Sequence, residues 1–130
     1  MSTDQNKAVV RRFITEVLSG GNYDLLDELL GPNYVNRGMG TTDLAGYKVA
    51  LPGLGAVVPN MQFDIEDLVA EGDAVVARWT AEVTHTTGKK ISLRGLTYYR
   101  LVDSKIVEDD PITSPDMAQI LGGLMPTAAP

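Results

Sequence analysis

The sequence predicts an α+β fold, in which a curved, cone-shaped antiparallel β-sheet wraps around N-terminal helices and encloses a pocket. Apolar residues recur at helical spacing before residue 61 and alternate with polar residues from there onward. Turn signals at 71–73 and 86–90 divide the alternating region into strands, as in an antiparallel meander. A curved sheet with helices at one end leaves a cavity between the two layers, and such a cavity is a common ligand site.

Two helices are expected at the start of the chain. Ser2 and Gln5 have the spacing of a capping box, in which each side chain satisfies the other's end of the helix backbone. Apolar residues then follow at helical intervals until the glycine pair at 20–21, which ends the first helix. Asn22 can cap a short second helix, which ends at the Gly-Pro pair 31–32.

A third helix is expected after the segment 33–42, which has no regular pattern and is interpreted as irregular. Thr42 can cap this helix, and Tyr47 and Leu51 belong to its apolar stripe. Pro52 is expected to kink it or to begin a new turn, because proline lacks an amide hydrogen and clashes with the preceding turn.

The alternating region is expected to form an antiparallel meander, followed by one more helix over 116–121. The alternating segments are 61–66, 75–85, 91–101 and 106–110. All of these elements fit one domain over 1–130, with a disordered tail at 124–130.

Composition argues against several classes of function. Seventeen acidic residues against eleven basic ones give a net charge of −6, which repels phosphate, so we expect no nucleic acid as a partner. The chain has no cysteine and a single histidine, His85, so we expect no thiolate or multi-histidine metal site. It also has no apolar run approaching ~18 residues and no signal-peptide pattern, so we expect a soluble, cytoplasmic protein that does not associate with a membrane.

Three acidic residues in a row, Glu108, Asp109 and Asp110, follow the apolar pair Ile106-Val107 in the last predicted strand. A run of this kind is most simply a solvated strand end. If one of these carboxylates instead faces the cavity, it can act as an acid or a base. Neighbouring side chains of a strand point to opposite faces, so Glu108 and Asp109 are expected to face opposite sides of the sheet.

Three blocks of the sequence together resemble the SnoaL-like polyketide cyclases. These blocks are NKAVVRRFITEVLSGGNYDLLDELLGPNYVNRG, ARWTAEVTHTTGKK and LVDSKIVEDDP…DMAQILGG, and the resemblance covers about residues 5 to 123. The family belongs to the nuclear-transport-factor-two-like superfamily, with the ketosteroid isomerases and limonene epoxide hydrolases. The resemblance implies a cone-shaped fold, a homodimer that packs through the sheet, and catalysis without a metal or cofactor.

The resemblance also implies that an Asp on the last strand is the acid/base that moves a proton next to a carbonyl group. Asp109-Asp110-Pro111 is similar to the family's Asp-Trp-Pro, which assigns the role to Asp109. Counting back from Leu121-Gly122 assigns it to Asp110 instead, so both remain candidates. The family's tryptophan falls at Asp110, and two adjacent carboxylates can raise the pKa of one of them.

Six further residues are candidates for substrate binding. Tyr34 and Asn36 have a Tyr-x-Asn spacing that also occurs in the family, and side chains two apart on an extended segment point the same way. The others share the strand faces that continue into the expected pocket wall, and the family's histidine falls at one of them, Thr97. These four are Trp79, His85, Thr97 and Tyr99. The ligand implied is a small hydrophobic compound with a carbonyl group.

Two other functions remain open. The superfamily's epoxide hydrolases use Arg-x-Asp on a middle strand, whereas this chain has Arg78-Trp79-Thr80 and lacks that Asp. The second alternative is a non-catalytic module that binds a small ligand in the pocket. For any of the three functions, Arg94, Leu96 and Tyr98 are expected on the outer face of the sheet, where we expect the homodimer contact.

Overall fold

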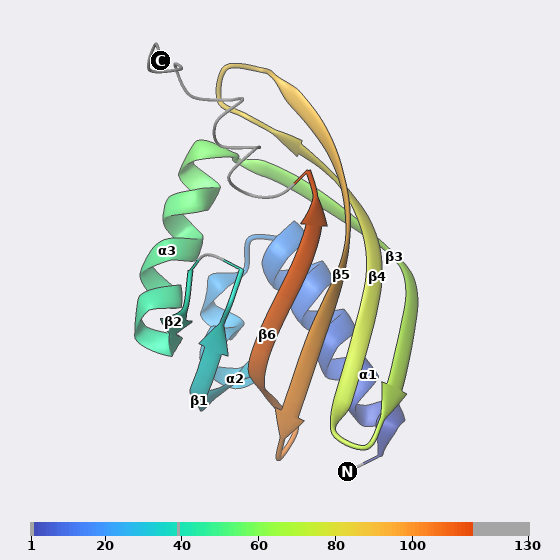
Figure 1. The fold of residues 1–130 in the computed structure, drawn as a ribbon. Helices are drawn as coiled ribbons and strands as arrows, with labels where there is room; N and C mark the ends of the chain where they lie inside the picture. The colour runs from blue at the N-terminus through green and yellow to red at the C-terminus, as the bar shows by residue number, and fades with distance from the viewer. Residues whose placement is uncertain (1, 39, 116–130) are drawn as a thin grey trace.

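The computed structural model describes residues 2–38 and 40–115, and it has the α+β architecture that the sequence predicts (Figure 1). The helical segments are α1 (Thr3–Arg12), a π-helical continuation η1 (Phe13–Ser19), a 3₁₀ turn η2 (Tyr23–Leu25), α2 (Leu26–Leu29) and α3 (Leu44–Val57). The strands are β1 (Leu30–Asn36), β2 (Thr42–Asp43), β3 (Asn60–Glu71), β4 (Ala74–Thr84), β5 (Lys90–Val102) and β6 (Lys105–Ser114). The predicted helix over 116–121 and the predicted tail at 124–130 lie outside the described residues.

The six strands form one curved sheet in the order β2-β1-β6-β5-β4-β3. Strands β3 to β6 are the predicted antiparallel meander, in which each strand pairs with the next along the chain. Figure 1 shows this sheet bending around α1, with α3 beside β1 and β2. The concave face of the sheet therefore meets the helices, and the core lies between them.

The sequence prediction is wrong for residues 30–36. It expected the end of a helix followed by an irregular segment, whereas the structure has a strand there. This strand, β1, pairs in parallel with β6, so the sheet is mixed and not wholly antiparallel. This pairing joins β1 to a strand more than seventy residues further along the chain, as in the pairing of Asn36 with Asp109, and β1 also pairs with the short strand β2. No local pattern reports such a partner, since strand propensity depends on context.

The ends of the helices differ from the prediction in two places. Asn22 makes no side-chain hydrogen bond to cap the second helical segment, and the third helix has a different cap residue. The capping box of α1 is present, with the Gln5 amide donating to Ser2 Oγ at 3.0 Å and the Ser2 amide donating to Gln5 Oε1 at 3.2 Å. The third helix is capped by Asp43 rather than Thr42, because the Asp43 carboxylate accepts a hydrogen bond from the Gly46 amide at 2.9 Å. Pro52 lies inside this helix, which continues to Val57.

The outer face of the sheet carries exposed apolar side chains on β5 and β6. Leu96 and Ile112 are paired neighbours that are 50% and 77% exposed, and Tyr98 on the same face is 37% exposed. Exposed apolar patches on a sheet often mark a contact between protein chains. This patch has the composition expected for the predicted dimer interface.

We expect the protein to sediment as a homodimer at micromolar concentration, with this patch at the contact. Leu96→Glu should give monomers, because it would place two like charges in a self-complementary interface. Val49→Lys, which changes an exposed apolar residue on α3, is the matched control and should leave the dimer intact. Sedimentation of the unchanged protein as a monomer would contradict the prediction.

Candidate active site

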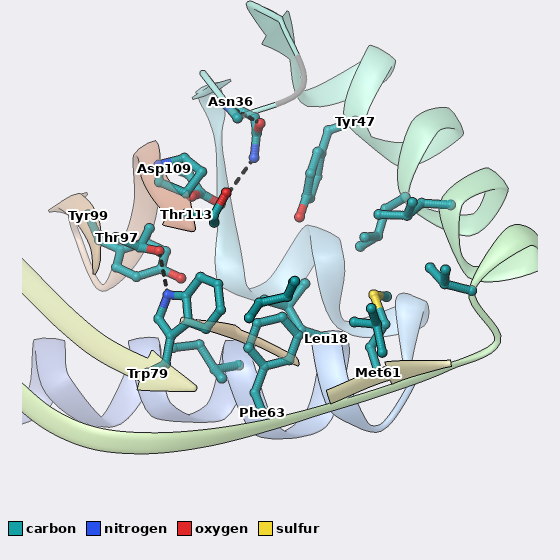
Figure 2. A pocket seen from close by; sticks show the side chains of 18 residues that line it. Leu18, Asn36, Tyr47, Met61, Phe63, Trp79, Thr97, Tyr99, Asp109 and Thr113 are labelled. Atoms are coloured by element: carbon teal, nitrogen blue, oxygen red, sulfur yellow. Dashed lines mark hydrogen bonds between the residues drawn. The ribbon is translucent and has the colours of Figure 1, made fainter. Parts of the chain in front are cut away.

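A pocket lies between the concave face of the sheet, η1 and α3 (Figure 2). Most of its wall is apolar, and the chief apolar contributors are Leu18, Leu54, Val58, Met61, Phe63 and Leu93. Polar side chains gather on the part of the wall that β5, β6, β1 and the first turn of α3 build. These are Asn36, Tyr47, Thr97, Tyr99, Asp109 and Thr113.

Asp109 is the acidic residue that faces this pocket. It is only 4% exposed and pairs across the sheet with Tyr99 on β5 and with Asn36 on β1. A β-bulge places it there, because Ile106 pairs with Leu101 and Glu108 pairs with Arg100, which leaves Val107 as an extra residue between them. Without that extra residue the strict alternation after Ile106 would turn Glu108 and Asp110 inward.

The two neighbouring acids lie on the outer face of the sheet. The Glu108 carboxylate accepts from Arg37 Nε at 3.2 Å and from Arg100 Nε at 3.4 Å. Asp110 pairs with Tyr98, which belongs to the outer face, and it does not line the pocket. Of the two aspartates that the sequence leaves open, the structure brings only Asp109 to the pocket.

Hydrogen bonds hold one oxygen of Asp109 in place. The Tyr34 hydroxyl donates to Oδ2 at 2.8 Å, and Asn36 Nδ2 donates to the same oxygen at 3.2 Å and to Tyr34 Oη at 2.9 Å. The Gly38 amide donates to Asn36 Oδ1 at 2.8 Å, so the Asn36 amide is oriented with its nitrogen toward Asp109. No residue in 2–38 or 40–115 donates a hydrogen bond to Oδ1, so this oxygen is the one available to a ligand.

Burial changes the acidity of this site. Removal from water raises the pKa of Asp109 to about 7, although the hydrogen bonds from Tyr34 and Asn36 oppose the rise and the charge of Asp110 adds to it. Burial, followed by the charge of Asp109, also raises the pKa of Tyr47 and of Tyr99 well above the ordinary value. Near neutral pH the carboxyl therefore exists in both protonation states, and the two phenols keep their protons.

The predicted substrate-binding residues are divided between the site and other parts of the fold. Asn36, Trp79, Thr97 and Tyr99 line the pocket, and Trp79 Nε1 donates to Thr97 Oγ1 at 2.9 Å. Tyr34 lies behind Asp109 and does not line the pocket itself, but it holds the carboxylate.

His85 is not brought to the site. It lies in the turn between β4 and β5, where its Nδ1 interacts with Thr87 Oγ1 at 2.9 Å and accepts from the Thr87 amide at 3.1 Å. These contacts give the ring a local structural role, since a side chain that accepts from a backbone amide two residues on stabilises a turn.

Sequence reasoning missed Tyr47 as a site residue, because it fits the apolar stripe of the third helix. The residue is 3% exposed and its hydroxyl points into the pocket (Figure 2). A tyrosine on the buried face of a helix was the available signal, since a buried phenol usually needs a polar partner. The polar groups that affect its pKa, Tyr34 and Asp109, belong to β1 and β6, which the local pattern does not connect to this helix.

Among the described residues, no group of three or more His, Asp or Glu side chains is arranged to hold a metal ion. Within the same part of the chain, no helix has the length and apolar character needed to cross a membrane.

We expect removal of metal ions to change neither fold nor activity, because the hydrogen bonds that hold the Asp109 carboxylate come from protein side chains. Prolonged dialysis against a chelator should leave the melting temperature within about 1 °C of its starting value. A fall of several degrees that added metal reverses would contradict this expectation.

Comparison with known proteins agrees with this architecture. Residues 8–120 match the family described as SnoaL-like polyketide cyclase. A solved structure from Acidithiobacillus ferrooxidans, named for an expected polyketide cyclase activity, is 32% identical with a TM-score of 0.79, over 95% of this chain and 97% of that one. IdmH from Streptomyces antibioticus, also named for an expected polyketide cyclase activity, is 25% identical with a TM-score of 0.76, over 91% of this chain and 99% of that one.

AclR from Streptomyces galilaeus, named for an expected hydroxylase activity, shares the fold at 22% identity, with a TM-score of 0.78 over 98% of this chain and 91% of that one. No curated protein matches the chain. The family match covers most of the sequence, and the structural neighbours have the nuclear-transport-factor-two-like fold. The cone-shaped fold and the match over residues 8–120 together show that this chain belongs to the SnoaL-like polyketide cyclase family.

Proposed function

We propose that this protein is a cofactor-independent enzyme that moves a proton at a carbon atom next to a carbonyl group. The reaction would be an isomerisation or an aldol-type ring closure, with Asp109 as the acid and base. The observation that carries this proposal is the buried Asp109 carboxyl, which faces a mainly apolar pocket and keeps Oδ1 available to a ligand. A pKa of about 7 for Asp109 suits a group that must both take and return a proton near neutral pH.

The geometry supports a short sequence of steps. Ionised Asp109 takes the proton from the carbon through Oδ1, and the electron pair of that bond moves onto the carbonyl to form an enolate. The enolate then either takes the proton back from Asp109 at a different carbon of its conjugated system, or its carbon attacks a second carbonyl, whose oxygen receives the proton from Asp109. Tyr34 and Asn36 are positioning residues in this scheme, because their hydrogen bonds hold Oδ2 and thereby aim Oδ1.

The pocket wall supports a hydrophobic ligand of neutral charge. Leu54, Val58, Met61 and Phe63 form an apolar region away from Asp109 that can bury a ring system. No lysine, arginine or histidine of the described residues lines the pocket, so a ligand carboxylate would have no opposite charge to pair with there. A small hydrophobic ketone or ester therefore fits better than a free acid.

The epoxide hydrolase alternative has less support. Thr80 takes the place of the middle-strand carboxylate, and Arg78 lies at the surface, where it pairs with Glu66 at 3.4 Å. Tyr34 and Asn36 bind Asp109 directly, so they are not arranged to hold a water molecule between them and the carboxylate. The non-catalytic binding module differs from the proposed enzyme in one measurable way, which is the absence of proton transfer.

The test uses 2-tetralone, a neutral bicyclic ketone with exchangeable protons beside its carbonyl. In deuterated buffer the protein should accelerate the replacement of these protons by deuterium, followed by proton NMR, above the rate in buffer alone. Binding of the ketone without faster exchange would favour the binding module. If the ketone neither binds nor exchanges faster than in buffer, the proposed ligand class is wrong.

A further inference from the structure

Tyr47 lines the pocket but is not one of the residues that hold the Asp109 carboxylate. It lies in the first turns of α3 with its ring packed against Tyr34, at a centroid separation of 5.1 Å and an interplanar angle of 50°. Its hydroxyl points into the pocket from the α3 side, whereas Asp109 enters from the sheet (Figure 2). A ligand in the pocket therefore has Tyr47 on its helix side and Asp109 on its sheet side.

Two of the polar groups near Asp109 already donate hydrogen bonds to it. Asn36 Nδ2 donates both to Asp109 and to Tyr34, and the Tyr34 proton is donated to Asp109. Thr97 Oγ1 accepts a hydrogen bond from Trp79 Nε1 at 2.9 Å. An enolate oxygen formed beside Asp109 therefore needs a donor from the remaining hydroxyls on the wall, which belong to Tyr47, Thr97, Tyr99 and Thr113.

We propose that Tyr47 is a catalytic residue that donates a hydrogen bond to the substrate carbonyl oxygen while negative charge builds on it. This inference rests on the proposed function. As Asp109 removes the proton, the electron pair of the broken carbon–hydrogen bond moves toward the carbonyl oxygen, and the Tyr47 hydroxyl stabilises it without losing its own proton. A preorganised donor in a site that excludes water acts more strongly on the enolate than on the neutral ketone.

Stereochemistry favours Tyr47 over Tyr99 for this role. The bond that breaks must stand perpendicular to the carbonyl plane, so the base approaches the flat face of the ligand, whereas the oxygen lone pairs lie in the plane. Tyr99 pairs with Asp109, and Thr97 and Thr113 line the pocket from the same two strands, so all three approach the same face as Asp109. Tyr47 reaches in from the helix and can meet the edge, where the oxygen accepts a hydrogen bond.

Tyr47→Phe should lower the rate of 2-tetralone exchange at saturating ketone by about 100-fold, the usual scale for one lost oxyanion donor. It keeps the ring that packs on Tyr34, so the fold should persist. Tyr99→Phe is the matched control and should have a much smaller effect. An unchanged rate for Tyr47→Phe, with exchange lost in Asp109→Asn, would overturn the role of Tyr47 and leave the proposed function intact; exchange that survives in Asp109→Asn would overturn the proposed function itself.

A second measurement does not depend on turnover. In the uncharged Asp109→Asn background, 2-naphthol presents an enol-like hydroxyl to the pocket, and naphthalene presents the same ring system without it. Adding Tyr47→Phe should weaken 2-naphthol binding about 10-fold, the effect of one hydrogen bond, and leave naphthalene binding unchanged. Equal losses for both compounds would show that Tyr47 only shapes the pocket, and would overturn the proposal.

Discussion

Replacement of Asp109 by Asn is expected to lower the rate of proton exchange at least ~100-fold, the usual scale of a lost general base, while the protein stays folded. Asn has the shape of a protonated Asp, and its side-chain oxygen can still accept the hydrogen bonds from Tyr34 and Asn36. It cannot take a proton from carbon. The rate should be followed by proton NMR with 2-tetralone in deuterated buffer, at a ketone concentration that saturates both proteins.

Asp110→Asn is the matched control for this experiment. It makes the same chemical change one residue further along, on a side chain that pairs with Tyr98 on the outer face. Its rate should stay within about twofold of the unchanged protein, since removal of a nearby surface charge alters the Asp109 site only weakly. Equal losses in the two variants, or no loss in Asp109→Asn, would contradict the assignment of Asp109 as the base.

The same substitution is expected to stabilise the protein at pH 8. The pKa of Asp109 rises from about 3.8 in the unfolded chain to about 7 in the folded protein, so the folded protein binds this proton more tightly. The free energy of unfolding is therefore largest below the unfolded pKa, falls as the pH rises between the two values, and is lowest above the folded pKa. A shift of this size corresponds to a loss on the order of 4 kcal/mol at pH 8.

Asp109→Asn removes this dependence, because the amide does not ionise. Denaturant unfolding should show the variant more stable than the unchanged protein by on the order of 2–4 kcal/mol at pH 8, with a much smaller difference at pH 4.5. Asp110→Asn should show no comparable change between the two pH values. A variant that is less stable at pH 8 would mean that the Asp109 carboxylate is not destabilised by its burial.

The alternating strands are the part of the fold that local sequence predicts well. On β4 the residues Val75, Ala77, Trp79, Ala81 and Val83 are all buried, as their two-residue spacing indicates. Periodicity suffices there because each strand pairs with its neighbour along the chain and has one face on the core. Strand β1 is harder to predict, because it pairs in parallel with the distant strand β6, and its antiparallel pairing along the chain is with the two-residue strand β2.

The choice between Asp109 and Asp110 could not be made from the sequence for a different reason. Strict alternation from Ile106, which is fully buried, would have placed Asp110 inside. The extra residue at Val107 reverses this phase and places Asp109 inside. A bulge depends on how two strands fit together in three dimensions, so counting along one strand does not reveal it. The hydrogen bonds from Tyr34 and Asn36 depend on the same pairing, because they reach Asp109 from the neighbouring strand β1.

The ionisation of Asp109 is the property on which the whole account depends. Carbon-detected NMR titration of the side-chain carboxyl groups, in the unchanged protein and in the Asp109→Asn and Asp110→Asn variants, measures it directly. We expect one aspartate carboxyl with a pKa near 7 in the unchanged protein and in Asp110→Asn, and its absence in Asp109→Asn. Titration of every aspartate near the ordinary value of about 4, or a group near 7 that persists in Asp109→Asn, would contradict the account.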